Sequence, residues 1–292
     1  SEMCIRDQSV MSYSKILTGA AIIAALSVAA YLLCYRWTTE RVPTKPTPKE
    51  KGQTWKVIKI LLHSQPYMAV CLVGMLFLAA QMFSQSYNTY LFNYYFNAPS
   101  LSMMPTVCQY LPVAVIMLFA GKLGARFGRR EVCAYGMLMA GVCNLALYLV
   151  GGTNVWMFLA VCLLSGIGNA FIFLLVWAIA TDAIDYNEVS YGLHDEATSY
   201  AFFTFMRKLG QTIAAILVNM ALLRIGYTNN VLNTANITGG TLDMMFTDSV
   251  LIPAVLYFLI FVILRFMYPL GREKIDQLQK EKEKLLSKLA EE

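Results

Sequence analysis

Acidic side chains lead directly into an apolar segment in residues 181–223. The acids include Asp182 and Asp185, and two cations, Arg207 and Lys208, lie inside the apolar run. A cation within a membrane helix needs a water-filled cavity or an acidic partner, because hydrocarbon solvates charge poorly. The arrangement therefore predicts ion pairs or a polar cavity within a membrane-spanning part of the chain.

The composition is that of a membrane protein. Hydrophobic residues make up 58% of the chain and charged residues only 14%, whereas soluble domains are about a quarter charged. The net charge of +5 does not predict nucleic-acid binding, because the lysines and arginines gather in connections and in the tail. The seven cysteines form no CxxC pair, so we expect neither a metal site nor a disulfide framework.

Seven apolar segments are long enough to cross a bilayer as helices, which takes about 20 residues each. They lie near residues 15–35, 66–95, 101–120, 131–150, 154–180, 198–224 and 247–269. The later half of the second segment is aromatic and polar, and its length predicts tilt, a break or an extension beyond the membrane.

The connections between these segments alternate in charge. Residues 36–59 and 121–130 are basic and the tail is rich in lysine, whereas the connections between them lack lysine and arginine. By the positive-inside rule the basic connections are cytoplasmic, so we expect the chain to start outside and its C-terminus to be cytoplasmic. Residues 181–197 should then also be cytoplasmic, but they are acidic, which indicates another role for them.

Two motifs resemble transporter sequences. GKLGARFGRR, residues 121–130, looks like a cytoplasmic loop signature of the major facilitator superfamily. DAIDYNEVSYGLHDE, residues 182–196, resembles the loop between helices ten and eleven of the glycoside-pentoside-hexuronide (GPH) cation symporters, the melibiose-carrier family. The matching residues are Asp182, Asp185, Tyr186, Glu188, Gly192 and Glu196. His194 stands where the family usually has arginine, and MRKLGQTIAA resembles the family's helix eleven, with Lys208 at its lysine.

The resemblance implies an all-α integral membrane fold, namely the C-terminal six-helix bundle of the major facilitator superfamily with one transmembrane helix before it. It implies a fragment of a secondary active transporter that moves a sugar (glycoside, pentoside or hexuronide) with a cation by alternating access. The cation is expected to be Na+ or H+, bound by N-terminal helices that are missing here. The expected partners are the sugar, the cation, membrane lipid and those helices, in the cytoplasmic (inner) membrane, with no cofactor and no enzymatic activity.

The same resemblance divides the chain into five parts. These are a non-native or fragment leader (residues 1–13), transmembrane helix six (14–35), a cytoplasmic linker (36–62), the six-helix transporter bundle (63–270) and a cytoplasmic helical tail (271–292). Prolines and charges make the linker a solvated hinge. Glutamate and lysine at helical spacing predict a solvated helix for the tail, with a partner-binding helix as the alternative.

The acidic and basic motifs are expected on the same side of the membrane. The resemblance implies that ion pairs between them hold the cytoplasmic side closed in one conformation and release it in another. This cytoplasmic gate comprises Asp182, Asp185, Tyr186, Glu188, Glu196, Arg126, Arg129 and Arg130. A solvated acidic loop is the alternative.

The route of substrate and cation is expected near the middle of the membrane. Lys208 lies about 14 Å along its helix, too deep to reach the membrane surface easily. Its place in the helix-eleven motif implies a transport role, and a structural ion pair is the alternative. Amide and aromatic side chains of other crossings suit sugar hydroxyls and rings, although they also make ordinary contacts between helices. The predicted route comprises Lys208, Arg207, Gln85, Asn88, Tyr87, Asn169 and Trp177.

Two further features have structural interpretations, and two other functions stay open. Arg224 lies at a helix end, where its side chain can reach the membrane surface. The run SGIGNA, residues 165–170, predicts close helix packing. An integral-membrane enzyme is one alternative, but His63 and His194 are the only histidines and form no catalytic cluster with other residues. A seven-helix receptor is the other, but it does not explain the acidic motif.

Overall fold

The computed structural model describes residues 13–38, 53–151, 154–192, 195–226 and 239–291, and every regular element in these ranges is a helix. The chain forms two compact units, Ser1–Glu50 and Lys51–Glu292. Helix α2 (Tyr13–Trp37) belongs to the first unit and the other helices belong to the second. Seven described helices are long and apolar enough to cross a membrane, as the hydropathy pattern predicts.

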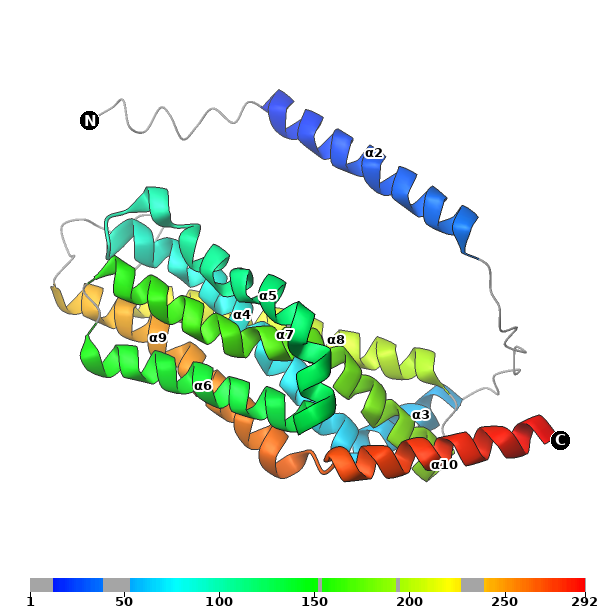
Figure 1. Cartoon of the computed structure of the whole chain (residues 1–292). Helices are drawn as coiled ribbons and strands as arrows, with labels where there is room; N and C mark the ends of the chain where they lie inside the picture. The colour runs from blue at the N-terminus through cyan, green and yellow to red at the C-terminus, as the bar shows by residue number, and fades with distance from the viewer. Residues whose placement is uncertain (1–12, 39–52, 152–153, 193–194, 227–238, 292) are drawn as a thin grey trace. The chain divides into compact units, whose positions relative to one another are not determined.

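Six long helices form a bundle in the second unit (Figure 1). They are α4 (Gln65–Tyr94), α5 (Met104–Phe127), α6 (Arg129–Val150), α7 (Val155–Tyr191), α8 (Glu196–Arg224) and α9 (Gly239–Val262). The shorter elements are α3 (Gln53–His63), a 3-10 turn η1 (Pro99–Leu101), a π-helical segment η3 (Ile263–Met267) and α10 (Arg272–Glu291). The segment η3 follows directly on α9.

Local sequence signals set the ends of α7 and α8. Asn154 caps α7, since its Oδ1 accepts a hydrogen bond from the amide of Trp156. Asp195 caps α8 in the same way, through the amide of Thr198. Gly192 ends α7 with a φ angle of 62°, a left-handed conformation that glycine adopts without strain.

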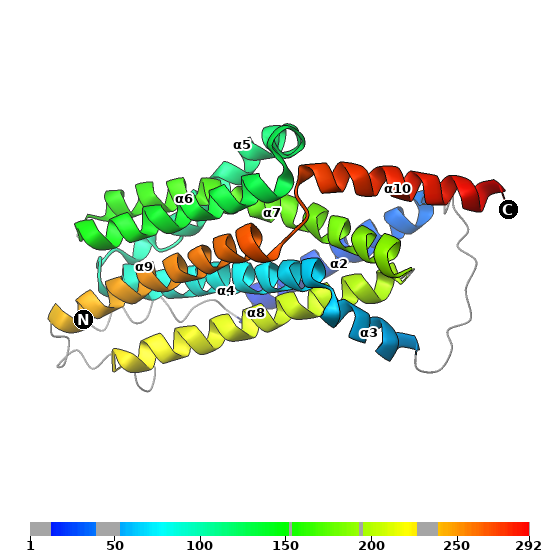
Figure 2. The same ribbon diagram turned by 90° about the horizontal axis from the view of Figure 1, so that it is seen from below.

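Helices α4 and α7 form the centre of the bundle. Helix α4 packs against α8 and α9, and α7 packs against α5 and α6 (Figure 2). Glycines allow α7 to approach both of its neighbours closely. A Cβ atom on Gly168 would meet the backbone of Gly136 in α6, and one on Gly166 would meet the backbone of Cys108 in α5. The packing role predicted for residues 165–170 is therefore confirmed.

Three segments differ from the prediction. Helix α3 occupies the second half of the expected linker, and its Val57 and Leu61 are buried, so this half is not a solvated hinge. Helix α7 has 37 residues and continues through Tyr191, so the acids predicted for a loop lie on its last turns. Helix α4 stays unbroken along its polar half.

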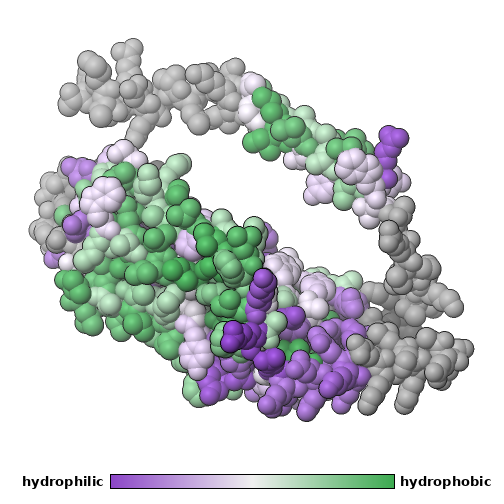
Figure 3. All heavy atoms as spheres, in the orientation of Figure 1, coloured by the Kyte–Doolittle hydropathy of each residue, from purple (hydrophilic) through white to green (hydrophobic). Residues whose placement is uncertain are grey.

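One end of the bundle is defined by the helix that follows it. We call the end where α5 and α7 finish and α6 and α8 begin the α10 end, because α10 packs there against α7. Hydrophilic residues gather around α10 in Figure 3, and hydrophobic residues cover the helices farther away. Leu278 of α10 is buried and Ile275 packs against the core, so the prediction of a wholly solvated tail is wrong.

Candidate functional site

An ion pair joins α6 to α7 at the α10 end. Arg129 Nη1 lies 2.6 Å from Asp182 Oδ1. The Asp182 side chain is buried, and its Oδ2 has no hydrogen-bond partner within the described ranges. The basic and acidic motifs therefore meet at this pair.

The next two acids of α7 pair with the tail rather than with the basic motif. Lys282 Nζ of α10 lies 2.6 Å from Asp185 Oδ1 and 2.7 Å from Glu188 Oε2. Burial alone would lower the pKa of Lys282, but its hydrogen bonds to both carboxylates and their charges raise that pKa above the ordinary lysine value. The expectation that the arginines of residues 121–130 pair with Asp185 and Glu188 is wrong, because α10 covers the face of α7 that carries these acids.

The other arginines of the predicted gate have local contacts. Arg130 Nε lies 3.4 Å from Glu131 Oε1, and Arg130 also donates a hydrogen bond to the Tyr268 carbonyl. The Arg126 guanidinium lies over the ring of Phe127. Both arginines therefore bind their own end of the bundle and not the acids of α7.

The remaining gate residues divide by exposure. Tyr186 is partly buried against the core, and Glu196 is exposed in the first turn of α8, while His194 lies outside the described residues. Sequence reasoning missed Asn187, whose Oδ1 accepts a 2.5 Å hydrogen bond from buried Ser64 just before α4. Its position inside the acidic motif is the signal that could have revealed it.

Amide and aromatic side chains connect α4, α5 and α7. Gln81 and Gln85 of α4 donate hydrogen bonds to the Tyr110 hydroxyl of α5, at 2.8 and 2.9 Å. Tyr110 packs edge-on against Phe173 of α7. Trp177 follows Phe173 by four residues and so lies one turn farther along the same face of α7.

Trp177 continues this series of contacts to α8. The Arg207 guanidinium carbon lies 4.7 Å from the centroid of the Trp177 ring, and Phe203 packs edge-on against that ring. Trp177 remains 42% exposed, and the buried Arg207 Nε has no hydrogen-bond partner in the part of the chain that the structure describes. We name the connected set the polar-aromatic row; it comprises Gln81, Gln85, Tyr110, Phe173, Trp177 and Arg207.

Lys208 belongs to a polar stripe on α8. Its Nζ lies 3.3 Å from Gln211 Oε1, and none of the described acids forms a salt bridge with it. Thr204 and Asn219 are exposed on the same helix face, whereas exposed apolar residues such as Phe205 lie about 100° away around the helix. Helix α8 therefore presents one polar and one apolar surface, with Lys208 on the polar one.

Three residues of the predicted route do not reach the polar-aromatic row. Tyr87 is fully buried and stacks on Phe83, and Asn88 is buried next to it in the chain. Asn169 Nδ2 donates a hydrogen bond to the Tyr257 hydroxyl between α7 and α9. Their expected role in lining a pocket is corrected to packing inside the bundle, because helical spacing alone does not reveal which face meets a neighbouring helix.

A further ion pair lies at the other end of the bundle. Arg224 Nη1 lies 3.1 Å from Asp248 Oδ1 of α9. Asp248 is buried and was missed, because the sequence places it at the margin of a loop, whereas α9 already begins at Gly239. The interpretation of Arg224 as a side chain that only reaches the membrane surface is therefore incomplete, since it also neutralises a buried acid.

Known proteins match almost the whole chain. The family model for the MFS/sugar transport proteins matches residues 7–272. An uncharacterized symporter, YjmB, of Bacillus subtilis is 27% identical over 263 residues, covering 88% of this chain and 55% of the relative. A putative 2,3-dihydroxypropane-1-sulfonate exporter of Salmonella typhimurium is 29% identical over 231 residues, covering 78% and 50%. A glucuronide carrier protein homolog of Escherichia coli is 26% identical over 265 residues, covering 88% and 55%.

The chain thus spans about half the length of the curated relatives it matches. Those relatives are named as a symporter, an exporter and a carrier, and none is named as an enzyme. The family match and the seven apolar helices confirm the resemblance seen in the acidic and basic motifs. The chain belongs to the MFS/sugar transport protein family and is a multi-pass membrane protein with the C-terminal six-helix bundle of that fold and one transmembrane helix before it.

Proposed function

We propose that the chain is one half of a cation-coupled sugar carrier that works by alternating access. The other half would be N-terminal helices outside this chain, in keeping with the greater length of the relatives. The coupling cation would be Na+ or H+, bound by those helices. Substrate sites of such carriers lie near the middle of the membrane, between the two halves.

The observation that carries this proposal is the polar-aromatic row. It crosses from α4 through α5 and α7 to α8 by direct side-chain contacts. Aromatic rings such as that of Trp177 can pack against the apolar faces of a sugar, while amides such as those of Gln81 and Gln85 can hydrogen-bond its hydroxyl groups. A row of this composition, with Trp177 partly exposed, suits a polyhydroxylated solute.

The charges beside the row favour an acidic sugar. Arg207 and Lys208 are adjacent on α8, and neither forms a salt bridge with an acid in the described ranges. A guanidinium stacked on a ring can still donate hydrogen bonds in its own plane, which matches the geometry of a carboxylate or sulfonate. Among glycosides, pentosides and hexuronides, we therefore place a hexuronide first, in line with the relative named as a glucuronide carrier homolog.

The charge distribution gives the orientation that we propose. The α10 end carries the basic connection between α5 and α6 and the lysine-rich tail, so the positive-inside rule places it in the cytoplasm of an inner membrane. The Arg129–Asp182 pair would then belong to a cytoplasmic gate. Such a gate exchanges ion pairs as the two halves rock about the substrate.

The test uses the full-length carrier in vesicles, with labelled glucuronide and a labelled neutral glucoside as probes. We expect an imposed Na+ or H+ gradient to drive glucuronide accumulation. Trp177→Leu should raise the KM for glucuronide about tenfold, because it removes the ring and its stacking on Arg207, and Trp177→Phe should raise it less. Trp156→Leu is the matched control, since Trp156 lies on the same helix but outside the row.

Each function gives a different result in this test. Glucuronide binding without gradient-driven accumulation would favour the receptor alternative. Accumulation of the neutral glucoside alone would retain the carrier and reject the acidic substrate. An equal effect of the Trp177→Leu and Trp156→Leu variants would remove the polar-aromatic row from the transport route.

A further inference from the structure

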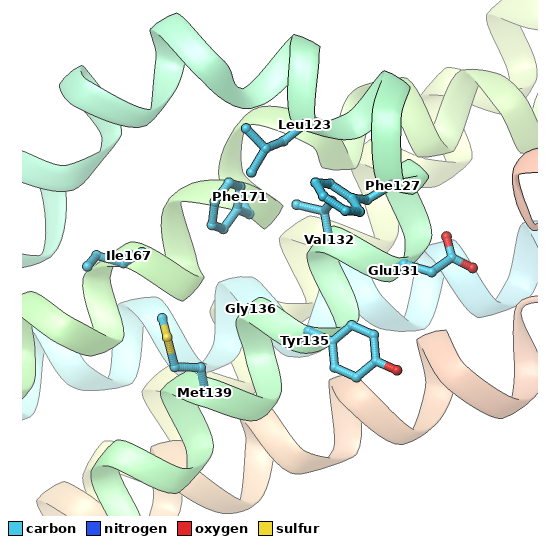
Figure 4. A pocket seen from close by; sticks show the side chains of 9 residues that line it. All are labelled: Leu123, Phe127, Glu131, Val132, Tyr135, Gly136, Met139, Ile167 and Phe171. Carbon is cyan, nitrogen blue, oxygen red and sulfur yellow. The ribbon is translucent and has the colours of Figure 1, made fainter.

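An apolar hollow lies between α5, α6 and α7 close to the α10 end (Figure 4). Its volume is about 480 Å3. Leu123 and Phe127 from α5, Tyr135 and Met139 from α6, and Phe171 from α7 line it. Phe127 and Tyr135 are each 59% exposed, so the hollow is open along the side of the bundle. The helices that form it are long and apolar enough to span a membrane, so the open side faces lipid.

A second hollow of about 410 Å3 adjoins the first and shares Phe127 and Glu131 with it. It lies where the chain passes from η3 into α10, and its lining is polar. Arg130, Arg272 and Lys274 contribute positive charge to it, and Glu131 and Glu273 contribute negative charge. The difference is one positive charge, to which Arg126 adds another from its position over the Phe127 ring.

Internal contacts occupy only part of this basic lining. Arg130 is engaged by Glu131 and by the Tyr268 carbonyl. Arg272 donates one hydrogen bond, from Nη1 to the Arg126 carbonyl at 2.7 Å. A guanidinium carries five N–H donors, so Arg272 retains donors for an anion, and exposed Lys274 lines the same hollow.

We propose that the two hollows together form a binding site for one anionic phospholipid of the leaflet at the α10 end. An acyl chain lies in the apolar hollow along Phe127, Tyr135 and Met139. The headgroup phosphate lies in the basic hollow, where Arg272 and Lys274 bind it. Two features on opposite sides of Phe127 and Glu131 thus match the two chemically different parts of one molecule, and basic pockets at the ends of membrane helices favour anionic headgroups.

The bound lipid has a structural consequence. It contacts α5, α6 and α7 through its chain and the start of α10 through its headgroup. The first residue of α10 is already held to α5 by the Arg272 hydrogen bond to Arg126. The lipid therefore adds a second connection between the tail and the bundle.

Photo-cross-linking tests the site directly. The full-length carrier is placed in vesicles of phosphatidylglycerol, phosphatidylcholine and phosphatidylethanolamine in equal amounts, with p-benzoylphenylalanine in place of Tyr135. Mass spectrometry then identifies the lipid attached after irradiation. We expect phosphatidylglycerol adducts to exceed phosphatidylcholine adducts at least about threefold. The same probe in place of Ile216, an exposed apolar position of α8 outside both hollows, should report the vesicle composition.

Charge variants then test the headgroup contact. Arg272→Gln combined with Lys274→Gln should return the ratio at position 135 to that of the vesicle. Lys59→Gln combined with Lys280→Gln removes the same charge from exposed positions outside the two hollows and should leave the ratio unchanged. Adducts in vesicle proportions at position 135 would overturn the proposal, as would a preference that survives the first pair of substitutions. A preference for phosphatidylethanolamine would overturn the assignment to an anionic lipid.

Discussion

Arg129 Nη1 lies 2.6 Å from Asp182 Oδ1, and this contact joins the first turn of α6 to α7. The two side chains differ in their access to water, because Asp182 is 6% exposed and Arg129 is 36% exposed. Loss of the arginine would strand a buried carboxylate, whereas loss of the carboxylate would leave a guanidinium that can still reach water. The pair is therefore asymmetric in its contribution to stability.

This asymmetry predicts unequal effects of neutral substitutions. Arg129→Gln should destabilise the bundle by about 3 kcal/mol, because it leaves a buried charge without its partner. Asp182→Asn should cost less than about 1 kcal/mol, and the double variant should be more stable than Arg129→Gln alone. Thermal unfolding midpoints of the purified carrier in one detergent measure all three. Equal losses for the two single variants would contradict the asymmetry.

The contacts of Lys282 change the expected partner of Asp185. Reversal of the acid in Asp185→Lys should impair transport, and the added substitution Lys282→Glu should partly restore it, because direct partners show non-additive effects. An added Arg126→Glu should give no restoration, since Arg126 contacts Phe127 instead. Uptake by vesicles, normalised to carrier amount, distinguishes the two double variants. Restoration by the Arg126 change and not by the Lys282 change would reject the contact as the basis of coupling.

The same contact has a predicted pH dependence on the alkaline side. The carboxylates of Asp185 and Glu188 raise the pKa of Lys282 above the ordinary lysine value of about 10.4. A raised folded-state pKa gives a stabilisation that is complete below the unfolded-state pKa and is lost as pH rises through the folded-state pKa. Between pH 7 and 9, the distance between spin labels at Ser190 and Gln279 should therefore stay constant. A change in that distance within this range would show that Lys282 does not hold α10.

Gly210 permits the close approach of α8 to α4. A Cβ atom at this position would meet the Met75 carbonyl of α4, which is backbone and cannot move aside alone. Gly210→Ala should therefore lower the free energy of unfolding by about 1 to 3 kcal/mol. Gly121→Ala is the matched control, because no atom lies within 4 Å of a Cβ there. A Gly210→Ala variant as stable as the control would show that α8 can shift without loss.

The membrane helices were predictable because their signal is local. Residues 66–95 were expected for α4, which runs over Gln65–Tyr94, and residues 131–150 for α6, which runs over Arg129–Val150. Hydropathy fixes these spans, since each must bury about 20 apolar residues in the bilayer. The meeting of Arg129 and Asp182 was also within reach, because antiparallel helices bring both motifs to one end of the bundle.

The features that sequence did not reveal depend on tertiary packing. Lys282 is one of many lysines in the tail, and only the docking of α10 on α7 selects it as the partner of Asp185. Tyr87 and Gln85 lie two residues apart on α4, yet Tyr87 packs into the core and Gln85 bonds to Tyr110. A helix with apolar residues on every face gives no moment that indicates which side is buried.

The last prediction concerns Lys208, which is exposed on the polar stripe of α8 and donates a hydrogen bond to Gln211. Because no described acid forms a salt bridge with Lys208, its removal strands no buried charge. Lys208→Met keeps much of the apolar stem, so the full-length carrier should insert in normal amount.

If Lys208 serves transport, the same Lys208→Met variant should lose gradient-driven sugar accumulation. Gln211→Met is the matched control, since it alters the same stripe without removing a charge, and it should retain most of the accumulation. Immunoblots of membranes and vesicle uptake measure the two quantities separately. Normal insertion with normal accumulation would exclude Lys208 from the mechanism. Failed insertion would instead indicate that its ammonium is paired within the assembled carrier, because only a structural partner would make the bundle depend on that charge.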